Sequence, residues 1–490
     1  MNKMKNIKIS ALLLAIVLST SCQKFLDVNT DPNNPTTSKL SLTLSAGTVW
    51  AATAQGDFLS STCGYFSQYW TGRPGIALQN LDRHEYPGAV SNNPWSFYYA
   101  RGLADLNFVA KSSEPLYSGI AKLLLAYHFQ VLTDCFGDVP YSEAFKGEIA
   151  DGSNVSPKFD DDVEIYKDLI VKIDEAISDL NTTVPGMLVP GDDDVIYGGD
   201  INKWIEFANS LKLKIYIRQA NTDAASVDAI KQKFADIWAN EPLILSNTDA
   251  CFVPFTGGTN SFNPLFAGDR GAPAFTGCET SIKFLELTAD PRIQKFYNQV
   301  TSGVYKGIPY GDVENQATNE ALFSNFKTPT FVYKSSAPVI LISAYEVYFI
   351  LAEAAARGWI SDPATVFYDN AVKLNFDYLG FSETDADSYL GSSGAYDATD
   401  LNSQLKSIAI QKWIAFNGLQ NVESWIEVRR FDTPSQTIFR GVGGIFRSPT
   451  RNSMGDNNFP SILLYSDNEL SFNANAPAQH SLTNRVFWDN

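Results

Sequence analysis

Several long segments of the chain place apolar residues three or four positions apart, the spacing of one face of an α-helix. Residues 201–221 carry one apolar stripe, with Lys and Arg on the opposite side and near the end. Residues 119–137 are apolar on nearly every side, which predicts a buried helix, and Gly137 is suited to its C-cap. Similar patterns predict helices over 159–180, 343–359 and 400–418. The chain is therefore predicted to contain several long helices.

The predicted helices follow one another as neighbours joined by modest linkers. The stretch ILAEAAARG at 350–358 has the small-residue spacing of a tetratricopeptide helix pair. No strict period of about 34 residues is present, so any such repeats are degenerate. Helical spacing is lost in three excursions rich in Gly, Pro, Asn and Thr, at about 65–95, 240–340 and 431–490. Loop regions of this length in a compact protein usually carry function.

The N-terminus has the pattern of a secretory signal. Residues 1–8 contain three Lys and no acid, and residues 9–18 are apolar. Ten apolar residues are too few for a mature membrane span, which needs about 20. LSTSC then resembles a bacterial lipobox, although Leu18 lies four positions before Cys22 where the usual pattern has three. We predict a signal peptide over 1–21, a lipidated Cys22 and polar stem over 22–38, and one domain over 39–490, with secretion without lipid as the alternative.

Two acidic stretches share features with calcium-binding loops. Asp27, Asn29 and Asp31 fit the first three ligand positions of an EF-hand, but Pro32 stands where its Gly is needed and Ser38 where its Glu is needed. The GDDDV segment at 191–195 offers hard oxygen ligands, although a solvated turn accounts for it as well and is the interpretation we favour. No metal site and no cofactor are predicted.

Charge and cysteine content restrict the partners. The formal net charge is −17, and loss of residues 1–21 removes three Lys, which makes it −20. Nonspecific binding to nucleic acid or to an anionic membrane surface is therefore excluded. Beyond Cys22, the chain has Cys63, Cys135, Cys251 and Cys278, with no C-x-x-C pair. Cys251 and Cys278 could pair, but buried free thiols are the prediction.

Catalytic signatures are scarce. The sequence has no G-x-S-x-G, H-E-x-x-H or G-x-x-x-x-G-K-[ST] motif and only three His. His128 lies in the apolar helix, where a hydrogen-bonded core role is expected, and His84 lies in the first excursion. We predict that the protein is not an enzyme. Two distant carboxylates could still meet as a glycoside-hydrolase pair, which keeps a glycan-degrading enzyme as the alternative from another class. A purely structural lipoprotein is a further alternative.

The stretch TDCFGDVPYSEAF at 133–145 resembles the SusD/RagB family of Bacteroidetes outer-membrane lipoproteins, in its second subgroup. The signal and the SCQKFLDVNTDPN stem match as well. Further stretches follow in the family's order at 207–219, 343–358 and 408–430. The end of the chain departs from the family's pattern, with Ile462 for its Arg and Ser466 for its Pro.

The resemblance implies a mainly α, SusD-like fold with four degenerate tetratricopeptide-like helix pairs and an irregular, loop-rich ligand-binding region. It implies a lipoprotein on the outer face of the outer membrane that serves as a lid on a SusC-like, TonB-dependent β-barrel transporter. The ligand expected from glycan-binding relatives is an oligosaccharide, and RagB-like members make a peptide the alternative. Members of the family are not enzymes.

The family's ligand regions correspond here to about 65–95 and 255–335, and individual residues were chosen within them by chemistry. Aromatic rings suit the apolar face of a sugar, and polar side chains suit its hydroxyls. The opposite interpretation, that the rings only pin the loop in place, stays open. The predicted roles are stacking for Tyr69 and Trp70, hydrogen bonding for Arg73 and His84, and closure of the far side for Phe275 and Tyr310.

Overall fold

The computed structural model describes residues 38–73, 80–147, 155–268, 274–312, 320–326 and 333–489. Over these residues the protein is mainly helical, so the predicted fold class is confirmed. The longer helices of the N-terminal half are α2 (Leu40–Ala54), α3 (Ser60–Phe66), α5 (Leu103–Ala110), α6 (Pro115–Phe136), α7 (Asp162–Leu180), α8 (Ile201–Arg218) and α9 (Ala224–Asn240). Those of the C-terminal half are α13 (Ala344–Ala356), α14 (Ala364–Tyr378), α15 (Glu383–Leu390), α16 (Leu401–Phe416) and α17 (Asn421–Phe431).

The excursions contain short elements rather than continuous loop. The short helices are α4 (Asn92–Phe97), α10 (Pro264–Gly268), α11 (Glu279–Leu287), α12 (Ile293–Phe296) and α18 (Asp467–Phe472). The strands are β1 (Trp70–Gly72), β2 (Val139–Pro140), β3 (Phe159–Asp160), β4 (Cys251–Val253), β5 (Phe275–Gly277) and β6 (Val339–Ile342). They pair antiparallel as β1 with β5, β2 with β3, and β4 with β6. The prediction that 240–340 lacks helical structure is thus wrong at α11.

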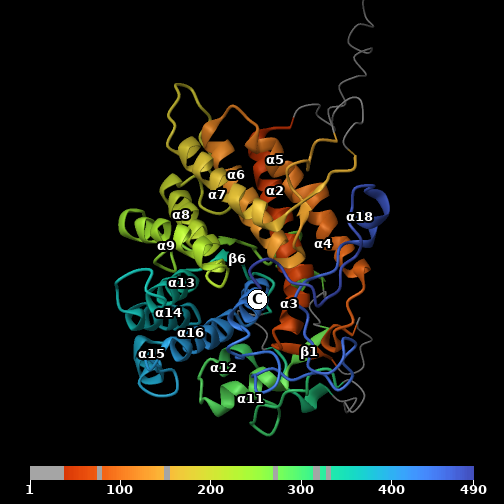
Figure 1. Cartoon of the computed structure of the whole chain (residues 1–490), viewed down its shortest axis with the longest axis vertical. Helices are drawn as coiled ribbons and strands as arrows, with labels where there is room; N and C mark the ends of the chain where they lie inside the picture. The colour runs from red at the N-terminus through yellow and green to blue at the C-terminus, as the bar shows by residue number, and fades with distance from the viewer. Residues whose placement is uncertain are drawn as a thin grey trace, which may run out of the picture.

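Consecutive helices pack against each other: α6 on α7, α8 on α9, α13 on α14, and α16 on α17. In Figure 1 these pairs descend from the top of the molecule along its left side, while the short elements and the C-terminal loops lie along the right and lower sides. The arrangement leaves one helical side and one irregular side. The assignment of these pairs to the tetratricopeptide type stays a prediction.

Local sequence explains where the predicted helices begin and end. The carboxylate of Asp161 accepts hydrogen bonds from the amides of Val163 and Glu164 and so caps α7. Asp200 caps α8 in the same way. Gly137 follows α6 at φ +75° and Gly418 follows α16 at φ +74°, a conformation that favours glycine. Both predicted C-terminal glycines are confirmed.

A network of buried charges joins the helices that form the centre of the molecule. The ammonium of Lys214 lies 2.9 Å from Glu346 and 2.8 Å from Glu423, and Arg218 lies 2.6 Å from Glu423. Arg218 also pairs with Glu427, so α8, α13 and α17 are linked. Asp134, Glu353, Lys412 and Arg430 extend the network. Removal of one partner from such a buried pair leaves an uncompensated charge, which costs about 3–5 kcal/mol.

The GDDDV segment forms a turn that holds the start of α8. Asp194 is only 4% exposed. Its carboxylate accepts hydrogen bonds from the amides of Ile196, Tyr197 and Gly199 and from the indole of Trp204 at 2.7 Å. The expected turn is therefore present, but Asp194 is buried and hydrogen-bonded rather than solvated.

The predictions about thiols and His128 can be checked directly. Cys63, Cys135, Cys251 and Cys278 are buried and free, so the predicted free thiols are confirmed. His128 is 1% exposed, and burial lowers its pKa to about 3, which confirms the core position. Its Nδ1 has no hydrogen-bond partner among the described residues, so the predicted hydrogen bond is not found at that nitrogen. Among the described helices, none is both long and apolar enough for a membrane span. Cys22 lies outside the described residues.

Candidate ligand-binding site

Trp70 and Phe275 lie on the paired strands β1 and β5, and their rings stack on each other with centroids 4.2 Å apart. Trp70 is 0% exposed and Phe275 is 1% exposed. The indole nitrogen of Trp70 donates to the carbonyl of Ser61 at 3.0 Å. Neither ring has a free face for a sugar. Their predicted roles as a stacking platform and as the far wall of a site are wrong for this structure.

Tyr69 directly precedes β1 in the chain. It is fully buried, its ring stacks on Trp413 at 5.7 Å, and its hydroxyl bonds to the carbonyl of Trp413 and to Ser424. Burial raises the pKa of this hydroxyl well above its usual value. The second predicted stacking platform is therefore a core residue that fastens β1 to α16 and α17.

His84 and Tyr310 meet in the same core. They are 2% and 4% exposed, and their rings lie 5.7 Å apart. Nδ1 of His84 lies 3.1 Å from Oδ1 of Asn452. Burial lowers the pKa of His84 to about 4, so the ring is neutral at pH 7. Both residues were predicted to contact the ligand, and this is wrong for this structure: they are buried and have a structural role.

Arg73 differs from the other predicted residues because it is partly exposed. Its backbone amide donates to the carbonyl of Ala274 at 3.1 Å, which continues the pairing of β1 with β5. A contact between its guanidinium and a ligand stays a prediction. Five of the six predicted residues therefore belong to a packed core, and an open surface has to be sought beside it.

Such a surface lies directly over the Tyr69 core, between α11 and the glycine-rich segment 441–447. We call it the aromatic hollow; its volume is about 360 Å³, and it is lined by Glu279, Thr280, Lys283, Phe284, Leu287, Gly443, Gly444, Ile445 and Arg447. Phe284 is half-buried, with its ring edge-on to Trp413 at 5.4 Å. Leu287 is 86% exposed. An aromatic ring and an aliphatic side chain are therefore open to solvent beside hydrogen-bonding groups.

Hydrogen bonds within the protein hold the polar groups of the aromatic hollow in place. Thr280 donates to Oε1 of Gln68 at 2.6 Å, and the same oxygen accepts from the amide of Arg447 at 3.0 Å. The guanidinium of Arg447 donates to the carbonyl of Gly444 at 3.0 Å. On the opposite side, Lys283 pairs with Glu279 at 2.5 Å on the surface of α11. A ligand here meets both donors and acceptors around one ring.

A second depression adjoins the first. We call it the polar hollow; its volume is about 400 Å³, and its lining includes Asp432, Thr437, Arg440, Asn457, Asn458, Phe459, Thr483 and Arg485. The side chains of Asn457, Asn458, Thr437, Thr483 and Arg485 are exposed. Amides, hydroxyls and a guanidinium of this kind suit sugar hydroxyls. Asp432 is committed to the fold, because it accepts the amides of Ile438, Phe439 and Arg440.

The loop Gly441–Gly444 lines both hollows. Gly441 and Gly443 have φ of +88°, and a Cβ on Gly444 would lie 2.2 Å from the carbonyl oxygen of Phe439. Glycine is required for this tight path. The loop therefore forms a narrow wall between two hollows of ligand-binding size. We refer to the two hollows together as the candidate groove; in Figure 1 α11 lies at the lower end of the molecule, beside the blue C-terminal loops.

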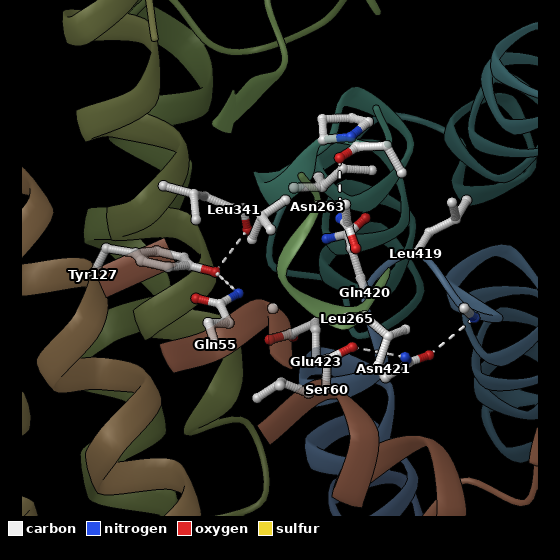
Figure 2. A pocket seen from close by; sticks show the side chains of 17 residues that line it. Gln55, Ser60, Tyr127, Asn263, Leu265, Leu341, Leu419, Gln420, Asn421 and Glu423 are labelled. Carbon is white, nitrogen blue, oxygen red and sulfur yellow. Dashed lines mark hydrogen bonds between the residues drawn. The ribbon is translucent and has the colours of Figure 1, made fainter. Parts of the chain in front are cut away.

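An enclosed polar pocket lies deeper in the protein. Figure 2 shows Gln55 and Tyr127 on one side of it and Gln420, Asn421 and Glu423 on the other. Gln55 donates to the hydroxyl of Tyr127 at 2.9 Å, which in turn donates to the carbonyl of Leu341 at 3.0 Å. Its volume is about 30 Å³, enough for water but far too small for a sugar. This pocket belongs to the buried polar network and not to ligand binding.

Comparison with known proteins identifies the fold's relatives. A SusD-like family model, described as starch-binding and associating with the outer membrane, matches residues 32–442. The chain belongs to this family. Comparison with curated proteins gave no match.

Solved structures agree on the SusD-like fold. A chitin-binding protein is 22% identical, with a TM-score of 0.74, and the match covers 91% of this chain and 99% of that one. A SusD homologue from Bacteroides thetaiotaomicron is 21% identical, with a TM-score of 0.74 and coverage of 92% and 99%. One from Bacteroides uniformis is 22% identical, with a TM-score of 0.74 and coverage of 92% and 100%. At these identities the likeness establishes the fold, which confirms the predicted SusD-like architecture.

The groove residues were missed in the sequence for a physical reason. Phe284 sits in a nine-residue helix within a Gly- and Pro-rich region, where the helical spacing is too short to stand out. The signal that could have found the other wall is the GVGG run at 441–444, because clustered glycines indicate a backbone path that other residues cannot follow.

Proposed function

We propose that this protein is a cell-surface lipoprotein, anchored through Cys22, that captures oligosaccharides in the candidate groove. It delivers them to a SusC-like, TonB-dependent outer-membrane transporter. The family assignment supports nutrient binding at the outer membrane, because the family is described as starch-binding. The chitin-binding relative supports a glycan ligand in the same fold.

The observation that carries the proposal is the half-buried ring of Phe284 in the aromatic hollow, together with the exposed amides and hydroxyls of the polar hollow, both of which are lined by the loop Gly441–Gly444. A sugar has an apolar face for the ring and hydroxyls for the polar groups, and the two hollows have volumes of about 360 and 400 Å³, within the range of small-molecule sites. Stacking on one ring contributes roughly 1 kcal/mol beyond the buried area. We therefore expect modest affinity built from several such contacts.

Calorimetry with starch oligomers, chitin oligomers and a mixed peptide pool tests the ligand class. We expect binding to one glycan series and none to the peptides. Phe284→Leu keeps an apolar side chain but removes the ring, so affinity should fall about fivefold for a stacking loss of about 1 kcal/mol. Phe108→Leu is the matched control, because Phe108 is 49% exposed on α5, outside the groove.

Three results would contradict the proposal. Binding to peptides alone would assign the protein to peptide capture, and unchanged glycan affinity in Phe284→Leu would move the site away from the aromatic hollow. Release of shortened products during incubation with the glycan would make the protein an enzyme. None of these three outcomes depends on whether Cys22 carries a lipid.

The anchor and the partner have their own tests. Mass spectrometry should find a lipid thioether on Cys22 as the first mature residue, and Cys22→Ser should give soluble protein or uncleaved precursor. A pull-down in mild detergent should recover a β-barrel of transporter size. An unmodified N-terminus would contradict the anchor, and repeated absence of a barrel would contradict the partner.

A further inference from the structure

A third hollow lies between α5, α6 and α7 and the segment that follows β2, with a volume of about 350 Å³. These three helices lie side by side at the upper end of the molecule in Figure 1, away from α11. Its floor includes Leu125, Ala126 and Phe129, and its walls include Tyr141 and Phe145. Four lysines complete the lining: Lys111, Lys122, Lys146 and Lys172. We call it the basic hollow.

The aromatic lining is held in a strained but defined geometry. The ring of Tyr141 lies edge-on to Phe129 at 4.8 Å, and Phe145 lies 6.4 Å from Phe129. Phe145 has φ +59°, a left-handed conformation that is unusual for a bulky residue. Such strain persists only where the surroundings enforce it, and it is concentrated at ligand sites. The backbone thus brings a half-exposed ring to the edge of an apolar floor.

The charge of the basic hollow is opposite to that of the chain, whose net charge is −17. Lys122 pairs with Asp179 at 2.8 Å and Lys172 with Glu175 at 3.2 Å. Lys111 and Lys146 are exposed and form no ion pair with any described residue.

Among the described residues that line the basic hollow, Asp168 is the one carboxylate, and it accepts a hydrogen bond from the hydroxyl of Tyr141 at 2.6 Å. Its acceptor capacity is therefore partly used. Toward the part of the chain that the structure describes, Lys111 and Lys146 are two cations without an ion-pair partner, and they lie beside an apolar, aromatic cavity.

We propose that the basic hollow binds a carboxylate carried on a ring that has an apolar face. The ring rests against the half-exposed ring of Phe145, and the carboxylate faces Lys111 and Lys146. A uronate unit of a glycan and a free aromatic acid share this chemistry. The basic hollow shares no residue with the candidate groove, so this proposal can be tested independently of the proposed function.

Calorimetry on the mature chain distinguishes the two sources. The probes are 4-hydroxycinnamate, its neutral amide, and a short oligogalacturonate. Binding of either acid supports the proposal and identifies its source, and added salt should weaken that binding because the lysines are exposed. The proposal is overturned if neither acid binds, or if the neutral amide binds as tightly as its acid.

Variants locate the site. Each exposed charge contact is worth up to about fivefold in affinity, so Lys111→Gln with Lys146→Gln should weaken binding by up to about 25-fold. Lys231→Gln is the matched control, an exposed lysine on α9. Phe145→Gly removes the ring without backbone strain, since glycine accepts positive φ, and should also weaken binding without loss of the folded state. Wild-type affinity in the double lysine variant would refute the assignment.

Discussion

Replacement of Trp70 by alanine separates a core role from a ligand-binding role. Trp70 is 0% exposed, stacks on Phe275 at 4.2 Å and donates to the carbonyl of Ser61. Removal of a fully buried Trp side chain costs about 3–5 kcal/mol in the free energy of unfolding. We therefore expect Trp70→Ala to lower stability by about 4 kcal/mol and to leave glycan affinity per folded molecule unchanged.

Urea denaturation is the suitable assay, because the change in melting temperature is small. Unfolding entropy is about 2.1 cal/mol/K per residue, or about 1 kcal/mol/K for 490 residues, so 4 kcal/mol lowers Tm by only about 4 °C. Trp50→Ala is the matched control. Trp50 is 36% exposed on α2 and lies under the guanidinium of Arg101 at 4.4 Å, so its loss should cost about 1 kcal/mol. A tenfold loss of affinity with unchanged stability in Trp70→Ala would refute the core placement.

Three further predictions concern the groove loop, the charge network and pH. Gly444→Ala should weaken glycan binding several-fold by moving the loop, since its Cβ would lie 2.2 Å from a backbone oxygen; Gly191→Ala, which meets nothing within 4 Å, should bind normally in the same calorimetric assay. Glu427→Gln should lower the free energy of unfolding in urea by about 3–5 kcal/mol, because buried cations lose their partner. His84→Asn should flatten the loss of stability between pH 6.5 and about 4. In that window the unfolded state binds a proton that the folded state excludes, at up to about 1.4 kcal/mol per pH unit, measured by urea titration at several pH values. Stable Glu427→Gln protein, or an unchanged pH slope for His84→Asn, would contradict these assignments.

The helical part of the fold was predictable because its information is local. The apolar spacing of 201–221 and the glycines at 137 and 418 are read within a few turns, and the structure places α8 and both helix ends there. The three-residue strand β1 cannot be recognised in this way. Its pairing partner β5 lies about 200 positions later, and the pairing is what buries Trp70.

The same difference between local and long-range information explains why buried residues were predicted to contact the ligand. The composition of the first excursion suggested exposed rings, since Gly and Pro are usual in surface loops. In the structure the hydroxyl of Tyr69 is bonded to α16 and α17, and Trp70 is covered by Phe275, so these contacts join residues more than 200 positions apart. A site formed by the ends of several distant segments leaves no continuous pattern in the sequence. Its residues become visible only when burial is known.

The stretches that carried the resemblance have a structural explanation of their own. Asp134 comes from 133–145, Lys214 and Arg218 from 207–219, Glu346 and Glu353 from 343–358, and Lys412, Glu423, Glu427 and Arg430 from 408–430. All of these charges meet in the buried network that joins α6, α8, α13, α16 and α17. A buried charge tolerates few replacements, because each partner requires the others. Positions with this constraint identify the fold while they make no contact with the candidate groove. The stretches that carry the family resemblance and the candidate groove can therefore lie on the same chain without sharing residues.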